Sequence, residues 1–100
     1  MTITILPNDR KTPPGKLADA ELRFEHGDLA GLKLTGFAIW ERRGNNGRAV
    51  TFPARQYTVS GERRSYALLR PIADLAAQTH LGGRILEAYT THERGEASDE

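Results

Sequence analysis

The spacing of apolar residues in this chain changes once, at Pro71, from a repeat of two to a repeat of three or four. Before Pro71, the stretches 18–25 and 32–41 alternate apolar and polar residues, which is typical of strands with one buried face. After Pro71, apolar residues recur at helical spacing as far as Tyr89. The sequence therefore predicts an α+β fold, in which a small antiparallel sheet of four to five strands precedes a C-terminal α-helix.

Glycine and proline mark the turns between the expected strands. The segment Gly44-Asn-Asn-Gly47 lies between two strand patterns and predicts a β-hairpin, because Asn and Gly tolerate positive φ. Within the expected strand at 32–41, the apolar positions shift by one residue at Gly36, which is typical of a β-bulge. The strand after the turn ends at Pro53, which has no N–H to donate to a ladder. A second pair of short strands follows, so two adjacent hairpins are predicted before Pro71.

The length and composition bound the class of protein. With 100 residues the chain has the length of one domain, and we expect that domain over 1–89 with an exposed, proline-containing loop at 7–16. Residues 90–100 are acidic and lack apolar anchors, which predicts a mobile tail. The absence of cysteine excludes a disulfide scaffold and a cysteine-ligated metal site. No apolar run approaches the roughly 20 residues of a membrane span and no secretory signal is evident, so a cytoplasmic protein without a membrane partner is expected.

Positive charge is concentrated in the middle of the chain. Residues 42–84 carry eight arginines against Glu62 and Asp74, whereas 1–41 and 85–100 both have a net negative charge. The guanidinium group can bind a phosphate through two parallel hydrogen bonds, so nucleic acid, either DNA or RNA, is a candidate partner. The alternative is a solvated arginine face that keeps a flat sheet soluble. The candidate nucleic-acid-binding residues are Arg42, Arg43, Arg48, Arg55, Arg63, Arg64, Arg70 and Arg84.

Aromatic residues are interleaved with these arginines. Aromatic rings stack on bases while arginines hold phosphates, a combination found in proteins that bind single strands. The alternation pattern places Trp40, Phe52 and Tyr66 beside other apolar residues, which favours core positions for them. Tyr57 lies between two polar residues and is expected to be exposed.

No residue set in the chain defines a reaction. The three histidines show no metal-binding spacing, and the chain contains neither a Gly-x-Ser-x-Gly nucleophile elbow nor a glycine loop that cradles phosphate. Asp19, Glu21 and Glu25 lie on the polar face of an expected strand, where carboxylates are usually solvated. We therefore expect a protein that is not an enzyme, with no metal, no cofactor and no identified small-molecule substrate.

Four segments in this order resemble the SpoVG (stage V sporulation protein G, septation regulator) family. They are Gly44-Asn-Asn-Gly-Arg-Ala-Val-Thr-Phe-Pro-Ala-Arg55, Gly61-Glu-Arg63, Arg70-Pro-Ile72 and Ile85-Leu-Glu-Ala-Tyr89. The resemblance implies a small bacterial cytoplasmic protein with a curved antiparallel sheet and a C-terminal helix. It also implies a homodimer that binds nucleic acid and acts as a regulator.

The chain departs from the family pattern at several charged positions. Arg55 stands where the family has a lysine, Gln56 replaces the arginine that follows, and Arg63 matches an arginine after the Gly-Glu turn. In the helix, Gln78 and His80 occupy two positions that are positively charged in the family. The helix therefore lacks these two charges, while arginines elsewhere in the chain add charge.

The residues and the resemblance together predict a non-enzymatic nucleic-acid-binding regulator whose arginines contact phosphates as a homodimer. The alternative is a protein-interaction module that binds a partner through a sheet edge or the helix, with the arginines serving solubility or an acidic protein surface. An enzyme with a pocket assembled across a dimer is a third possibility, which no residue set supports.

Overall fold

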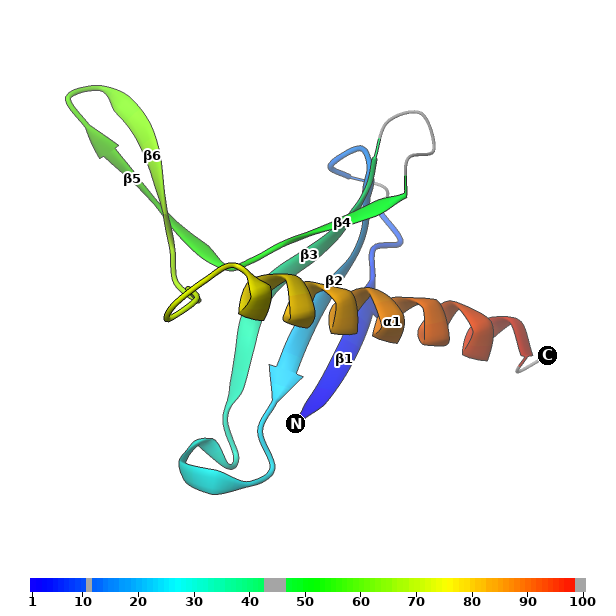
Figure 1. Cartoon of the computed structure of the whole chain (residues 1–100). Helices are drawn as coiled ribbons and strands as arrows, with labels where there is room; N and C mark the ends of the chain where they lie inside the picture. The colour runs from blue at the N-terminus through cyan, green and yellow to red at the C-terminus, as the bar shows by residue number, and fades with distance from the viewer. Residues whose placement is uncertain (11, 43–46, 99–100) are drawn as a thin grey trace.

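The computed structural model describes residues 1–10, 12–42 and 47–98, with the side chains described as far as residue 95 (Figure 1). The described chain forms strands, one short 3-10 helix and one long α-helix, so the predicted α+β class is confirmed. The elements are β1 (Thr2–Pro7), β2 (Lys16–Arg23), η1 (Gly27–Leu29), β3 (Lys33–Glu41), β4 (Arg48–Thr51), β5 (Ala54–Val59), β6 (Glu62–Ala67) and α1 (Ala76–Ser98).

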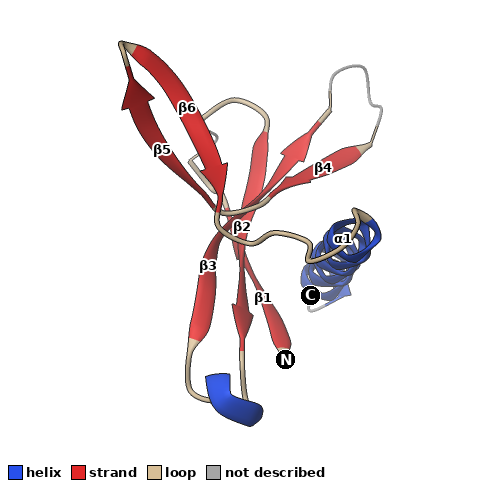
Figure 2. Cartoon of the chain, turned by 60° about the vertical axis from the view of Figure 1, so that its left-hand side comes forward, coloured by secondary structure: helices blue, strands red, loops and turns tan. Residues whose placement is uncertain are grey.

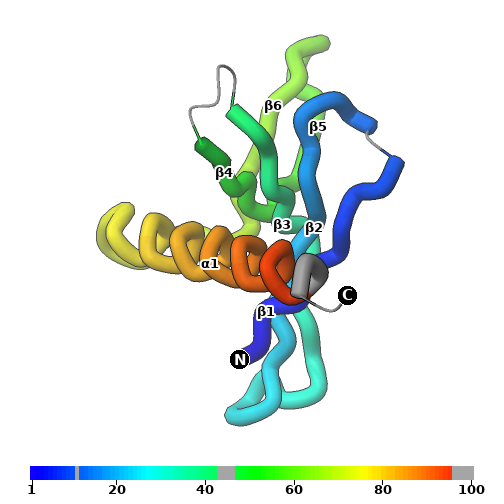
Figure 3. Tube along the Cα trace, turned by 90° about the vertical axis from the view of Figure 1, so that its right-hand side faces the viewer, coloured from blue at the N-terminus to red at the C-terminus, as the bar shows by residue number. Residues whose placement is uncertain are grey.

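The strands form two separate sheets. β1 to β4 pair in sequence order as an antiparallel four-stranded sheet, and α1 lies across one face of it (Figure 2, Figure 3). β5 and β6 form a two-stranded hairpin that projects away from this sheet (Figure 1). The two hairpins predicted from the sequence therefore do not lie in one sheet, and β1, which the residue pattern did not predict, completes the larger sheet.

The core lies between the four-stranded sheet and α1. The inward faces of β2 and β3 meet one face of the helix, where Phe37, Ile39 and Ile85 are fully buried. The Phe52 ring packs edge-on against Phe37, with ring centroids 5.2 Å apart. Burial of this apolar surface holds the helix on the sheet. The buried core residues are Ala18, Ala20, Leu22, Phe37, Ile39, Ile85 and Tyr89.

The β-bulge predicted at Gly36 is confirmed. The register of β2 against β3 shifts here, with Ala20 opposite Phe37 but Leu22 opposite Leu34. Gly36 has a φ of +105°, and a Cβ atom built on it would lie only 2.8 Å from the Cβ of Pro53. Glycine is therefore required here for both its backbone conformation and its lack of a side chain.

Pro53 ends β4, as predicted, and forms the base of the projecting hairpin. Its side chain is buried, and its carbonyl accepts a hydrogen bond from the backbone N–H of Leu68 at 2.9 Å. This bond joins the two ends of the β5–β6 hairpin directly beyond its last strand pair, Ala54 and Ala67. The hairpin thus leaves the body at a fixed, hydrogen-bonded point.

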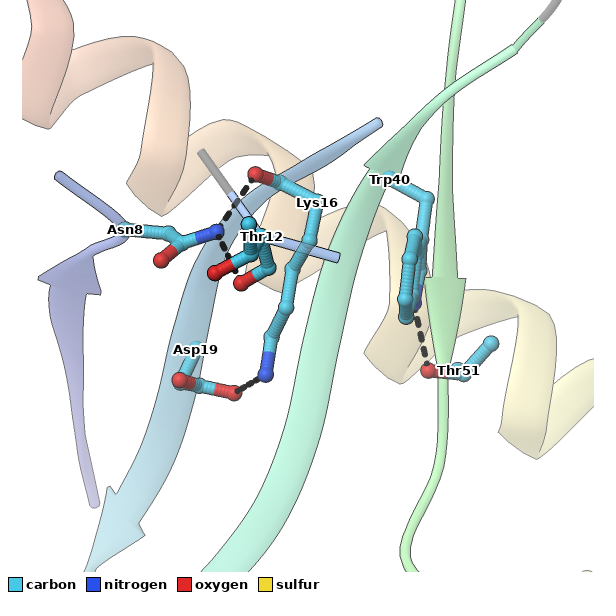
Figure 4. Close-up of polar contacts among 6 residues, drawn as sticks. All are labelled: Asn8, Thr12, Lys16, Asp19, Trp40 and Thr51. Carbon is cyan, nitrogen blue, oxygen red and sulfur yellow. Dashed lines mark hydrogen bonds and ion pairs between the residues drawn. The ribbon is translucent and has the colours of Figure 1, made fainter. Parts of the chain in front are cut away.

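The predicted loop at 7–16 lies between β1 and β2, with Pro7 ending β1 and Lys16 beginning β2, and it is largely exposed over its described residues, as predicted. The amide of Asn8 spans it, because its Nδ2 donates to the carbonyls of Thr12 at 3.2 Å and Lys16 at 3.0 Å (Figure 4). These bonds hold the two ends of the loop together.

The helix differs from the prediction at both ends. It begins at Ala76, whose N–H donates to the Asp74 carboxylate at 2.8 Å, and it continues unbroken through the Gly82-Gly83 pair. The predicted mobile tail at 90–100 is wrong over its described part, because α1 extends to Ser98. A long-range contact explains the extension, since Glu93 in this stretch forms an ion pair with Arg48 on β4.

Glu21 is a buried carboxylate on β2, with a residue exposure of 5%. The guanidinium of Arg23 lies 3.1 Å from it and the ammonium of Lys33 lies 3.4 Å away. The hydrogen bond from Arg23 is the main reason that the pKa of Glu21 lies below its ordinary value. The prediction of a solvated carboxylate is therefore wrong for Glu21, while Asp19 and Glu25 form more exposed ion pairs.

The contact between Gly36 and Pro53 predicts a specific cost of adding a methyl group. Gly31→Ala provides the control, because Gly31 also has positive φ (+87°) but a Cβ atom added there would have no neighbour within 4 Å. The control should lose about 1–3 kcal/mol of unfolding free energy through backbone strain. Gly36→Ala should lose at least about 1 kcal/mol more through the clash. Urea unfolding followed by Trp40 fluorescence measures both, and equal losses would contradict the contact.

Glu21 should make stability sensitive to acid. Because its pKa is lowered in the folded state, its ion pairs stabilise the protein above the pKa of the unfolded chain, and this contribution is lost as the pH falls through the folded-state value. Glu21→Gln should therefore lose less unfolding free energy than the wild type between about pH 6 and about pH 3. Denaturant titrations at a series of pH values test this, and identical acid dependence in the two proteins would refute it.

Candidate nucleic-acid interface

The structure divides the predicted arginines among different parts of the molecule. Arg55, Arg63 and Arg64 lie on the β5–β6 hairpin, and Arg70 follows it. The others lie on the body of the protein, apart from Arg43, which is outside the described residues. Those on the body are Arg42 after β3, Arg48 on β4 and Arg84 on α1.

One face of the hairpin combines arginine and tyrosine. In the antiparallel register Arg55 is opposite Tyr66 and Tyr57 is opposite Arg64. Residues directly opposite in such a pair share a face, and so do residues two apart along a strand, so these four side chains form one block. We call this block, Arg55, Tyr57, Arg64 and Tyr66, the Arg–Tyr face. Every residue of both strands is exposed, because no other element covers either side of the described hairpin.

The Arg–Tyr face contains a shallow hollow. A space of about 310 Å³ is lined by Arg55, Tyr57 and Tyr66. The guanidinium of Arg70 lies over the Tyr66 ring, 4.9 Å from its centroid, and this cation–π contact restrains the ring.

The opposite face of the hairpin is polar and lacks aromatic residues. Thr58 is paired with Arg63, and Gln56 with Ser65, whose hydroxyl accepts a 3.4 Å hydrogen bond from the Gln56 amide. Arg63 is therefore separated from the other arginines of the hairpin by the thickness of the ribbon. Alternation along each strand assigns Arg63 to the opposite face from Arg55 and Arg64 once the pairing of β5 with β6 is known.

The charges on the hairpin are largely available to a ligand. Arg64 lies 3.2 Å from Glu62, but both side chains are exposed and such a pair contributes little. Within the described residues, Arg55 and Arg63 have no carboxylate at ion-pair distance. Two exposed guanidinium groups, one on each face, can therefore bind an anion without first breaking an ion pair.

Arg48, in contrast, is engaged within the protein. Its two terminal nitrogens donate to the two oxygens of Glu93 at 2.7 and 3.0 Å, and its guanidinium lies 4.7 Å from the centroid of the Tyr89 ring. The hydrogen bonds to Glu93 raise the pKa of Arg48. This contact fastens α1 to β4 and neutralises the arginine, so the structure does not support Arg48 as a phosphate ligand.

The two remaining body arginines lie apart from the hairpin arginines. Arg42 lines a groove between β4 and the first half of α1, which also contains Phe52 and Gly82. Arg84 lies on α1 beside the beginning of β1, on the side of the sheet away from β4. The seven predicted arginines within the described residues therefore do not form one continuous patch.

The aromatic predictions are confirmed in part. Phe52 packs in the core region and Tyr57 is exposed, as expected. Tyr66 is 51% exposed, so its predicted core position is wrong, because β6 belongs to the projecting hairpin rather than to the sheet under the helix. Trp40 is half-buried, and its indole N–H donates to the Thr51 hydroxyl at 3.0 Å (Figure 4).

The described residues contain neither a candidate metal site nor a candidate membrane span. Within 1–10, 12–42 and 47–98, no group of three or more His, Asp or Glu side chains is placed to hold a metal ion. The same part of the chain contains no helix that is both long and apolar enough to cross a membrane.

Comparisons with known proteins add no assignment. The chain matched no protein-family model, no curated protein and no solved structure. Its function is therefore inferred from its residues and their geometry.

Proposed function

We propose that this protein is a non-enzymatic, SpoVG-like regulator that binds nucleic acid through the arginines of the β5–β6 hairpin. The observation that carries the proposal is the exposure of Arg55, Arg63 and Arg64 on a hairpin that projects from the body. Guanidinium groups bind phosphate oxygens in a charge-assisted, two-point geometry. A projecting ribbon can bring such groups to a phosphate backbone without a clash between the backbone and the body of the protein.

The internal pairing of charge in the body supports the same surface. Several acidic side chains of the body bond to neighbouring cations, among them Glu21, Glu25 and Glu93. Arg48 is neutralised in this way, whereas Arg55 and Arg63 have no such partner within the described residues. Arg42 and Arg84 lie on the body, apart from the hairpin, so the proposed phosphate-binding surface does not include them.

We propose that the protein acts as a homodimer. An isolated two-stranded hairpin is at best marginally stable in water. Both faces of β5 and β6 are exposed, and the segment that follows them exposes the apolar side chains of Leu68, Ile72 and Leu75. A second copy that covers this segment would bury these side chains, support the hairpin and double the number of phosphate-binding arginines.

The double variant Arg55→Gln/Arg63→Gln tests the binding surface. It should weaken binding to labelled DNA or RNA at low salt and flatten the dependence of the logarithm of affinity on the logarithm of salt concentration. The expected change in slope is about 0.7 to 0.9 for each arginine–phosphate interaction that the variant removes. Fluorescence anisotropy at several salt concentrations measures both effects.

The matched control is Arg10→Gln/Arg94→Gln, which removes the same charge outside the hairpin and should retain more of the wild-type affinity. Light scattering on the same samples should give the mass of two 11.1 kDa chains. Unchanged affinity in the hairpin variant would exclude this surface. If the wild type bound no duplex DNA, single-stranded DNA or RNA at low salt, the proposed function would be wrong and a protein-interaction module would be favoured.

A further inference from the structure

We propose that the Arg–Tyr face binds single-stranded nucleic acid, with bases stacked on Tyr57 and Tyr66 and phosphates held by Arg55 and Arg64. This inference rests on the proposed function and specifies the class of nucleic acid and the groups that contact it. It starts from two tyrosine rings that the fold leaves in solvent, with exposures of 39% for Tyr57 and 51% for Tyr66.

The arrangement of the four side chains matches the repeating chemistry of a nucleic-acid strand. Each tyrosine has one arginine directly opposite it on the other strand and a second arginine two residues away along its own strand. Opposite Cβ atoms in an antiparallel pair are about 4.5–5.5 Å apart, and residues two apart on a strand are separated by about 7 Å. A base on either ring therefore has a phosphate-binding group close to it on two sides.

The Tyr66 ring is both exposed and held in place, which favours stacking. Arg70 lies over it, 4.9 Å from the ring centroid, and restrains the ring; in the proposed complex the base stacks on the side away from Arg70. The hollow lined by Arg55, Tyr57 and Tyr66 has a volume of about 310 Å³, at the lower end of the roughly 300–1,000 Å³ typical of small-molecule sites. A single nucleotide is a ligand of suitable size and chemistry for this space.

Single strands suit this face better than a duplex. In a duplex the flat faces of the bases are already stacked on one another, so exposed rings gain no base contact unless the stack is opened. In a single strand the base faces are free, and stacking on an aromatic side chain contributes about 1–3 kcal/mol for each base. The face offers few groups that could read base edges, so modest sequence preference is expected.

The opposite side of the hairpin supplies an internal comparison. It carries Arg63 but no aromatic side chain, and its neighbours are the short polar residues Thr58 and Ser65 together with Gln56. The Arg–Tyr face carries one more arginine, but Glu62 lies on the same face and pairs with Arg64, so the two sides have the same formal charge. A purely electrostatic ribbon would therefore bind about equally well through either side. If bases stack on the tyrosines, binding will depend on one side of the ribbon.

The double variant Tyr57→Leu/Tyr66→Leu tests the stacking, and Tyr57→Phe/Tyr66→Phe is the matched control that keeps the rings. Binding to labelled oligo(dT) and oligo(rU) should weaken by at least about tenfold in the leucine variant, since about 1.4 kcal/mol corresponds to a factor of ten. The phenylalanine variant should stay within about threefold of the wild type, because every base can stack on a ring without the hydroxyl. The wild type should bind a duplex of equal length more weakly than it binds the single strands. The affinity for this duplex should be the same in all three proteins.

The outcomes separate this inference from the proposed function. Wild-type single-strand affinity in the leucine variant, with the arginine dependence intact, would overturn the stacking site and leave the phosphate surface standing. An equal loss of duplex and single-strand binding would also overturn it, and circular dichroism of the variant would show whether the hairpin had unfolded. An absence of all nucleic-acid binding in the wild type would overturn both proposals. The comparison of oligo(dT) with oligo(rU) distinguishes DNA from RNA as the ligand.

Discussion

The contact between Gly36 and Pro53 determines where the chain leaves the sheet. The bulge at Gly36 removes a side chain from β3 at the point where the buried Pro53 ring needs the space. Pro53 cannot continue the β4 ladder, while Phe52 directly before it packs against Phe37 in the core. The chain is therefore held in the core at Phe52 and leaves the four-stranded sheet at Ala54, so β5 and β6 pair with each other away from the helix. The exposure of every residue of the hairpin follows from this arrangement.

The body and the hairpin use their charges in different ways. In the body, the bidentate contact between Arg48 and Glu93 joins β4 to α1, and the cluster around Glu21 joins neighbouring strands. These pairs stabilise the fold and remove their charges from any interaction with a ligand. On the hairpin, Arg55 and Arg63 are left without such a partner within the described residues. A chain with a formal net charge of +1 can in this way present a locally basic arm.

Local patterns predicted most of the elements but not their arrangement in space. Alternation and turn residues predicted β2, β3, the bulge at Gly36 and the two hairpins, because these depend on neighbours in the sequence. The separation of the second hairpin from the sheet depends on the contact between Gly36 and Pro53. Because these two residues are distant in sequence, local patterns predicted neither the separation nor the exposure of Tyr66 that follows from it. The partner of Arg48 lies 45 residues away, which is why both its neutralisation and the extension of α1 were missed. For the candidate site, the sequence indicated arginines interleaved with aromatic residues, and the register shows which two arginines and two tyrosines share a face.

The central claim is that nucleic acid contacts the projecting hairpin rather than the helix. Backbone amide NMR spectra of the isotope-labelled protein, recorded during titration with a short unlabelled single-stranded oligonucleotide, test it most directly. The expected result is that shift changes concentrate at residues 54–67 and at Arg70. Changes centred on α1 between Ala76 and Tyr89, or along the groove beside β4, with the hairpin signals unmoved, would contradict the claim.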